Sequence, residues 1–303
     1  QCGLQGFVRN DTTGVTIEAQ GWTDAIEEFD AALAQQKPTL AWFRVVDCRE
    51  VDPIFNETGF RIEESHVNCD ESVFAQVTID AAVCDDCLNE MLDPKDRRHR
   101  HGLINCTNCG PRYSIIQHIP YDRPNTTMAG FAMCSQCAGE YDQPQDRRFH
   151  AQPTACLACG PKVTLVDSAG TALGGDPYIE AAARLRAGEV LAIKGLGGFH
   201  LATRADDDRA VAHLRQLKHR DQKPFAVMCR SIEVARQMVT LSDTAAELMQ
   251  SPYCPIVLAP WRVDTSIAAG VAPDNHRIGV MLPYTPVQHL LFSELDSSVD
   301  ALV

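Results

Sequence analysis

The sequence carries a cysteine pattern that occurs twice, and this duplication constrains the fold more than any other feature. Each copy holds two Cys-x-x-Cys pairs, with the run E-x3-P-x-D-R-R between them and Gly-Pro after the second pair. The eight cysteines are Cys84, Cys87, Cys106, Cys109, Cys134, Cys137, Cys156 and Cys159. Two cysteines three residues apart can bind one metal from a tight turn, and a second such turn completes a four-sulfur site. The spacing therefore predicts two structural Zn²⁺ sites.

Disulfides, an iron–sulfur cluster and a redox-active pair are the alternatives to zinc. Disulfides form in oxidising compartments, and this sequence shows no secretory signal. The C-x2-C-x2-C run of bacterial ferredoxins is absent, and a redox motif does not need four copies. Pairing within each copy is the preferred assignment, and an interleaved pairing stays open at this point.

Composition limits the classes of function. With 303 residues the chain is long enough for two or three domains, and 45% hydrophobic and 22% charged residues are typical of globular proteins. No apolar run approaches the length of a membrane span, so we expect no membrane partner. The net charge of −13 argues against a general nucleic-acid binder. Thirteen cysteines without a secretory signal predict a cytoplasmic protein.

Four segments differ in pattern. They are a small α+β unit at 1–66, a linker at 67–83, the tandem zinc-finger block at 84–163, and an α/β domain at 176–303. The finger block has little regular apolar spacing, so metal must supply much of its folding energy. The chain begins with Gln, and its last residues resemble the start of a buried strand. We therefore expect a fragment, truncated at the N-terminus of the first unit and at the C-terminus of the last domain.

Hydrophobic periodicity and capping residues predict the elements of the two outer segments. In 1–66 we expect strands at 6–10, 15–19, 41–46 and 59–63, and a helix at 23–36 capped by Thr23. In 176–303 we expect strands at 190–194, 199–203, 225–229 and 256–259, and helices at 178–187, 207–217, 232–239, 243–250 and 286–295. Asp206 or Asp207 is the candidate cap of the second of these helices.

Two clusters in the last segment have the chemistry of an anion site. The first is a strand end and glycine-rich turn that contains Lys194, Gly197, Gly198, Phe199 and His200. Its glycines let backbone amides approach phosphate oxygens, although a plain tight turn, with His200 capping a strand, fits as well. The second cluster contains Lys218, His219, Arg220 and Lys223. It either clamps a nucleotide triphosphate or is a solvated turn that complements a helix dipole.

Four arginines recur in the finger copies. They are Arg97, Arg98, Arg147 and Arg148. They either line an anionic passage or pair with the neighbouring Asp96 and Asp146. The finger histidines are more simply surface or supporting groups than ligands, because eight cysteines already saturate two zinc ions.

Residues 176–303 resemble YrdC-type domains in the order of three runs. These are K-G-x-G-G-F-H-L, then K-H-R-x-x-K-P-F-A-V-M, then I-G-V-M-L-P. The resemblance implies a YrdC-like α/β fold that binds ATP and forms an acyl- or carbamoyl-adenylate. The runs I-N-C-T-N-C-G-P-R, P-Y-D-R-P and D-R-R-F-H-A-Q-P resemble the paired zinc fingers of HypF-type carbamoyltransferases. Residues 1–66 are similar to the later part of an acylphosphatase domain, a ferredoxin-like fold, and Asn10 matches its catalytic asparagine. The family's arginine loop and Ser-Gly-Asn segment are expected on the flanks of this sequence.

The resemblance implies an enzyme of nickel–iron hydrogenase maturation. Such proteins convert carbamoyl phosphate and ATP, with Mg²⁺, to carbamoyl-adenylate. They then pass the carbamoyl group to a cysteine of a HypE-type partner protein for cyanide ligand synthesis. A zinc-organised RNA- or protein-binding module without catalysis is the alternative, and the net charge of −13 favours a small-molecule site over RNA.

Overall fold

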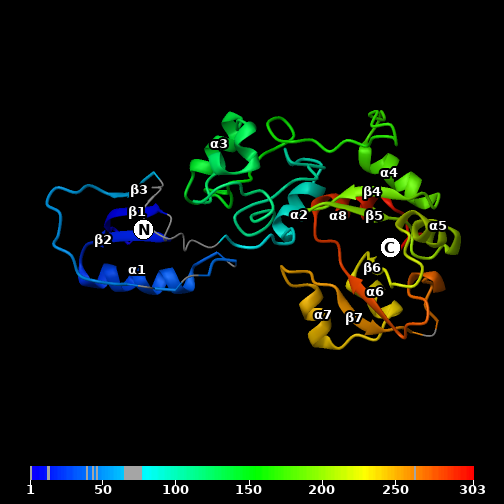
Figure 1. The fold of residues 1–303 in the computed structure, drawn as a ribbon. Coiled ribbons are helices and arrows are strands. Elements are labelled where there is room, and N and C mark those ends of the chain that lie inside the picture. Colours follow the sequence, from blue (N-terminus) through cyan, green and yellow to red (C-terminus); the bar gives the residue numbers. More distant parts are fainter. Residues whose placement is uncertain are drawn as a thin grey trace. The chain divides into compact units, whose positions relative to one another are not determined.

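A computed structural model describes residues 2–11, 14–38, 40–42, 44–45, 47–64, 77–262 and 264–303. Within this part of the chain the contacts define two compact units (Figure 1). The first comprises residues 1–79 and 115–130, and the second comprises residues 80–114 and 131–303. Of the predicted linker at 67–83, residues 67–76 lie outside the described residues. No helix in the described ranges has the length and apolar character needed to cross a membrane.

The first unit contains a three-stranded sheet in the order β2-β1-β3. Its strands are β1 (Gln5–Asn10), β2 (Val15–Gln20) and β3 (Phe60–Ile62). β1 pairs antiparallel with β2 and parallel with β3. Gly6 in β1 has φ of +137°, and a side chain there would collide with the backbone of β2, so glycine is needed at this position.

Helix α1 (Thr23–Gln35) follows β2 and packs beside β3, where the rings of Phe29 and Phe60 lie 6.2 Å apart. Two predictions for this unit were wrong. Thr23 is the first helical residue rather than the cap, because Trp22 holds the extended N-cap position. The strand expected at 41–46 is not formed by its described residues, among which Trp42 and Val45 are 76% and 65% exposed. The unit also contains the short helices η1 (Arg123–Asn125) and η2 (Thr127–Gly130).

The second unit has a four-stranded sheet in the order β7-β8-β6-β9 and a hairpin of β4 and β5. These strands are β4 (Leu191–Lys194), β5 (Phe199–Ala202), β6 (Ala226–Cys229), β7 (Val257–Pro260), β8 (Arg277–Met281) and β9 (Ala301–Leu302). Thr203 and Val303 exchange two backbone hydrogen bonds of 3.0 and 2.9 Å, so the chain directly after β5 is held beside the end of β9. β8 was not among the predicted strands.

Helices cover this mixed sheet. They are α4 (Pro177–Arg186), α5 (Asp208–Lys218), α6 (Ile232–Met238), α7 (Asp243–Met249) and α8 (Pro286–Glu294), with the short helix η3 (Ala269–Val271). Buried side chains of α5, α6, α7 and the sheet form the main core, and α4 packs with α8 in a second cluster. Asp207, one of the two candidate caps, accepts the first amide hydrogen bonds of α5. The predicted α+β and α/β architecture is confirmed.

The finger block contains two short helices that the sequence pattern did not predict, α2 (Asp85–Leu92) and α3 (Ser135–Asp142). Each begins directly after the first cysteine of its copy. The first finger also contributes to a hydrophobic cluster in which Met91 and Ile104 pack with Tyr178 and Leu290 of α4 and α8. The apolar contacts of the first finger are therefore made largely with the α/β part of this unit.

Candidate metal centres and nucleotide site

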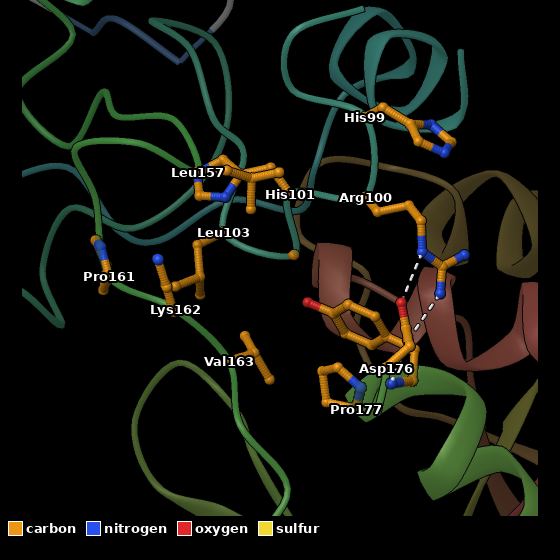
Figure 2. A pocket seen from close by; sticks show the side chains of 12 residues that line it. His99, Arg100, His101, Leu103, Leu157, Pro161, Lys162, Val163, Asp176 and Pro177 are labelled. Atoms are coloured by element: carbon orange, nitrogen blue, oxygen red, sulfur yellow. Dashed lines mark hydrogen bonds and ion pairs between the residues drawn. The ribbon is translucent and has the colours of Figure 1, made fainter. Parts of the chain in front are cut away.

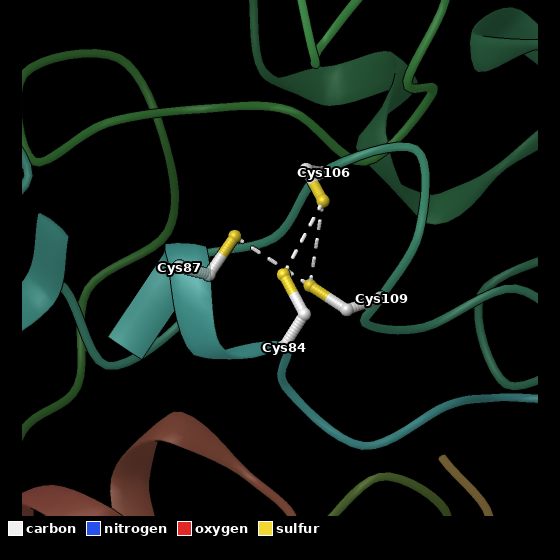
Figure 3. A group of neighbouring side chains, drawn as sticks. All are labelled: Cys84, Cys87, Cys106 and Cys109. Atoms are coloured by element: carbon white, nitrogen blue, oxygen red, sulfur yellow. Dashed lines mark hydrogen bonds between the residues drawn. The ribbon is translucent and has the colours of Figure 1, made fainter. Parts of the chain in front are cut away.

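The eight cysteines form two groups of four, one in each copy of the repeat. In the first group Cys84 and Cys87 flank the start of α2, and Cys106 and Cys109 lie on a returning turn (Figure 3). Gly110 follows this turn at φ of +90°, and an added side chain would collide with Asn105. The second group contains Cys134, Cys137, Cys156 and Cys159. The structure thus groups the sulfurs within each copy rather than between copies.

The sulfur geometry fits a tetrahedral metal. In the first group the Sγ atoms of Cys106 and Cys109 are 3.8 Å apart, and those of Cys84–Cys106 and Cys87–Cys109 are 3.7 and 3.5 Å apart. In the second group the corresponding distances are 3.8, 3.8 and 3.6 Å. A tetrahedron with zinc–sulfur bonds of 2.3 Å has edges of about 3.8 Å. All four sulfurs of each group lie within 4.8 Å of one another, so both donor sets support zinc binding.

Arginines of the second copy contact the first metal group. Arg147 donates a 2.7 Å hydrogen bond to Cys87 Sγ and forms 3.1 Å ion pairs with Glu90 and Asp86. Arg148 donates to Glu90 and to the carbonyl of Asn105, the latter at 3.2 Å. Burial lowers the pKa of Arg147, but the negative charges of Cys87 and its neighbours outweigh it and raise that pKa above its usual value.

Arginines of the first copy contact the second metal group in the same way. Arg97 and Arg98 of the first copy donate to Cys137 Sγ at 3.3 and 3.6 Å, and both pair with the carboxylate of Glu140. Arg98 also donates to the carbonyl of Ala155 at 3.0 Å, as Arg148 does to the equivalent Asn105. Burial raises the pKa of Glu140, but hydrogen bonds from Arg98 and Arg97 hold it at about 2.

Of the two roles expected for these four arginines, pairing with Asp96 and Asp146 was wrong, and the anionic passage stays a prediction. Asp96 and Asp146 accept backbone hydrogen bonds from Arg98 and Arg148, at 2.7 and 2.8 Å, and thereby fix the turns that carry the guanidinium groups. The guanidinium groups themselves reach the glutamate and the cysteine of the opposite copy. Sequence reasoning missed Glu90 and Glu140 in this role, although both recur in the repeat.

The first finger is held on the α/β part by Arg100. Its guanidinium pairs with Asp176 at 2.9 Å and with Glu294, and lies over the ring of Tyr178. Beside it is a cavity of about 320 Å³, walled by finger residues and the start of α4 (Figure 2). Burial, with the nearby charges of Arg98 and Arg148, lowers the pKa of the lining residue His101 to about 4, so its imidazole is neutral at pH 7.

The glycine-rich cluster forms the turn of the β4–β5 hairpin. The amide of Gly195 donates to the carbonyl of Gly198 at 2.7 Å, which closes the turn around Gly197. Lys194 Nζ lies 5.4 Å from the centre of the Phe199 ring, and this ring is 70% exposed. His200 Nε2 lies 3.4 Å from the hydroxyl of Tyr284. The hairpin therefore presents a cation, an aromatic face and an imidazole together.

The basic cluster forms the end of α5. His219 takes the left-handed conformation at φ of +48° and ends the helix after Lys218. Arg220 donates to the carbonyl of Pro224 at 2.6 Å, which closes the turn that carries Lys223. Among the residues that the structure describes, no hydrogen bond or ion pair joins this turn to the β4–β5 hairpin.

Arg215 is a residue that sequence reasoning missed. Its guanidinium donates to the carbonyls of Arg220, Asp221 and Lys223 in the basic turn, at 2.6 to 3.2 Å. It also donates to the carbonyls of Gly270 and Val271. A charged residue on the core-facing side of a helix is the only sequence signal of this role. Arg215 thus holds the backbone of the predicted phosphate clamp.

Asn10, the predicted catalytic residue of the first unit, is the last residue of β1. It pairs with Val15 of β2 at the turn end of this hairpin, and its side chain is half-buried. The neighbouring Arg9 pairs with Glu63 at 3.8 Å.

Three family models match the chain. Residues 1–62 match the acylphosphatase family, and residues 83–116 and 133–166 match the HypF finger. Residues 183–301 match the YrdC-type family described as telomere recombination.

Curated relatives match almost all of the chain. It is 49% identical over 297 residues to the carbamoyltransferase HypF2 of Cupriavidus necator, and 48% identical over 289 residues to the carbamoyltransferase HypF of Rhodobacter capsulatus. These alignments cover 97% and 95% of this chain, and 37% and 38% of those proteins. The chain therefore spans well under half the length of these relatives.

Two solved structures share its fold. A crystal structure of full-length HypF in the phosphate- and nucleotide-bound form superposes with a TM-score of 0.90 at 43% identity, and covers all of this chain. The crystal structure of HypF from T. kodakarensis superposes with a TM-score of 0.87 at 39% identity over 99% of it. The chain covers 39% and 38% of those two proteins.

Proposed function

Because the chain belongs to the HypF-type carbamoyltransferase family, we propose that it serves in ATP-dependent carbamoyl transfer for nickel–iron hydrogenase maturation. The family membership was predicted from the finger runs and is confirmed. The substrates, the adenylate intermediate and the partner are the content of the proposal.

In the first step the acylphosphatase unit, matched over residues 1–62, cleaves carbamoyl phosphate. Water attacks phosphorus, the bond between phosphorus and the acyl oxygen breaks, and carbamate and phosphate form. Asn10 lies at the strand end where its amide can bind the acyl phosphate or the attacking water. The arginine expected from the family's loop supplies the positive charge for this step.

In the second step a carbamate oxygen attacks the α-phosphorus of ATP and pyrophosphate leaves, which gives carbamoyl-adenylate. The cations Lys194, Lys218, Arg220 and Lys223 offset the charge that develops on the phosphate oxygens. Mg²⁺ brought with its substrate ATP would supply further positive charge to the leaving pyrophosphate. The carbamoyl group then passes to a cysteine thiol of a HypE-type protein, and AMP is released.

The β4–β5 hairpin is the observation that carries the nucleotide part of the proposal. It combines an ammonium group, an exposed aromatic face and a glycine turn within residues 194–200. Aromatic faces stack on nucleobases and glycine turns expose amides to phosphates. A relative that superposes on this chain was crystallised with phosphate and a nucleotide bound.

The reaction is tested by the exchange of labelled pyrophosphate into ATP by the full-length protein. We expect exchange that depends on carbamoyl phosphate, because the reversible adenylation step that releases pyrophosphate requires carbamate as its second substrate. Exchange that is absent, or unchanged by carbamoyl phosphate, would contradict the proposal. Salt-sensitive binding of RNA in its place would favour the zinc-organised binding module.

Replacing Lys194 by alanine is expected to weaken ATP binding by roughly tenfold, which corresponds to the loss of one phosphate contact of about 1.4 kcal/mol. Calorimetric titration of the full-length protein with ATP and Mg²⁺ measures the change in Kd. Lys95→Ala is the matched control, because Lys95 is an exposed lysine of the finger block. Equal Kd values for the two variants would remove Lys194 from the site.

A further inference from the structure

We propose that the two metal centres form one cooperative unit, in which the arginines of each finger control how firmly the other finger retains its metal. This inference concerns the fingers alone and is independent of the proposed carbamoyl transfer. It follows from contacts that cross between the two copies of the repeat.

The geometry starts in the two short helices. In α2, Cys87 and Glu90 are three residues apart, and in α3, Cys137 and Glu140 have the same spacing. Residues at this spacing lie on one face of a helix. Each helix therefore presents a metal-binding sulfur and a carboxylate side by side to the opposite finger.

A pair of arginines from the opposite finger contacts each of these helix faces. Arg147 and Arg148 bind the face of α2, and Arg97 and Arg98 bind the face of α3. The guanidinium groups reach both groups on each face, with Nη–Sγ distances of 2.7 Å to Cys87 and 3.3 Å to Cys137. Each bridging arginine is thus placed to hold the glutamate and the thiolate of the other copy at once.

These contacts bear on metal retention for two reasons. Four thiolates around Zn²⁺ carry a net negative charge, and N–H groups that donate hydrogen bonds to the sulfurs stabilise that charge. One arginine of each pair is also enclosed, since Arg98 and Arg148 are 2% and 3% exposed, while Arg97 and Arg147 are half-buried beside them. A buried guanidinium that loses its acceptors is costly, so each arginine pair stabilises its own finger only while the other finger is folded around metal.

The coupling is therefore mutual. Metal loss from the first site frees Cys87 and α2, and Arg147 and Arg148 lose their acceptors. The second finger, which carries those arginines, is then less stable and holds its own metal less firmly. Thermodynamic linkage requires the reverse effect to be equally large.

The test uses the full-length protein loaded with ¹¹³Cd²⁺, which gives one NMR resonance for each four-sulfur site. Cys106→Ser and Cys156→Ser assign the two resonances, because each removes one ligand of one site. Transfer of the metal to a chelator is then followed separately at each resonance. This readout reports metal retention and does not depend on enzymatic activity.

In Arg147→Ala we expect metal loss from the first site to accelerate by about 10-fold to 100-fold, because removal of a group that supports a metal ligand weakens metal affinity by about this factor and we expect the weakening in the release rate. Arg147 belongs to the second copy, so the effect crosses between fingers. The first resonance should also shift, because the hydrogen bond to Cys87 is lost. Arg97→Ala should reverse the pattern and act first on the second site.

Arg184→Ala is the control, because Arg184 lies on an exposed part of α4 and pairs with Glu189 beyond the end of that helix, outside both fingers. If an alanine variant fails to fold, Arg147→Lys keeps the charge without the forked donors and is expected to show an intermediate rate. Unchanged release at the first site in Arg147→Ala and Arg147→Lys would overturn the proposal. So would acceleration confined to the site of the mutated copy.

Discussion

Removing the metal is expected to unfold both fingers. Structural zinc contributes roughly 10–16 kcal/mol to the folding of small finger domains, which matches or exceeds the entire stability of an ordinary domain, about 5–15 kcal/mol. The amides of residues 84–163 should therefore lose protection from hydrogen exchange in chelator and regain it when zinc is restored. Exposure should extend to Tyr178 and Leu290, which pack against Met91 and Ile104 of the first finger.

A pair of cysteine variants controls this result. Cys106→Ser removes one ligand of the first group and should expose the first finger even in excess zinc. Cys254→Ser changes a cysteine outside both groups and should leave exchange in the fingers unchanged. Full protection of residues 84–163 in protein shown by elemental analysis to lack metal would disprove the structural role of zinc.

Replacing Arg215 by methionine is expected to lower the free energy of unfolding by about 3 kcal/mol or more. Five backbone carbonyls would lose a charged donor, and each hydrogen bond to a charged group contributes about 1.5–3 kcal/mol, with incomplete additivity. Methionine fills much of the arginine volume, so the loss would arise from the carbonyls more than from a cavity. Urea unfolding followed by the signal of the α/β part measures this effect.

The same variant should weaken ATP binding, because the turn that carries Lys218, Arg220 and Lys223 would no longer be held. Arg209→Met is the matched control, since Arg209 is an exposed arginine on the same helix. If Arg215→Met unfolded at the same urea concentration as Arg209→Met, the Arg215 guanidinium would have no structural role.

The sequence predicts best where local chemistry decides the outcome. The repeated spacing predicts the four Cys-x-x-Cys turns, because such a turn can present both sulfurs to one point, and the structure decides for pairing within each copy, which the spacing alone left open. The position of α5 follows from an aspartate cap, and that of the turn after β4 from an apolar run that ends in glycines, although β4 is half-exposed rather than buried as expected. Helices α2 and α3 escaped prediction because their N-cap residues, Cys84 and Cys134, form no side-chain cap hydrogen bond, whereas Ser231 and Ser242 cap the equally short α6 and α7.

Prediction failed where contacts between distant segments decide the outcome. The arginines of the repeat have an aspartate beside them in sequence, yet they bind Glu90 and Glu140 of the opposite copy. Only the packing of one finger against the other brings these groups together. Arg215 is a similar case, because its acceptors at Gly270 and Val271 are more than fifty residues away. Residues 41–46 have the composition of a strand, but the described ones have no strand to pair with.

Among the positions at which the two copies of the repeat differ, one concerns the attachment of the first finger to the α/β part. Arg100 and His150 occupy equivalent left-handed positions, at φ of +58° and +50°. Arg100 binds Asp176 and Glu294, whereas the His150 ring contacts the rings of Tyr141 and Phe149 in its own copy, the latter edge to face. In a single copy of this motif, the arginine pair would lack its glutamate and thiolate acceptors, and the glutamate would lack its arginines. Such a copy would satisfy these groups only by forming a symmetric dimer of separate chains. Tandem fusion removes that dependence on concentration and lets the two halves differ, so that one of them serves as an anchor.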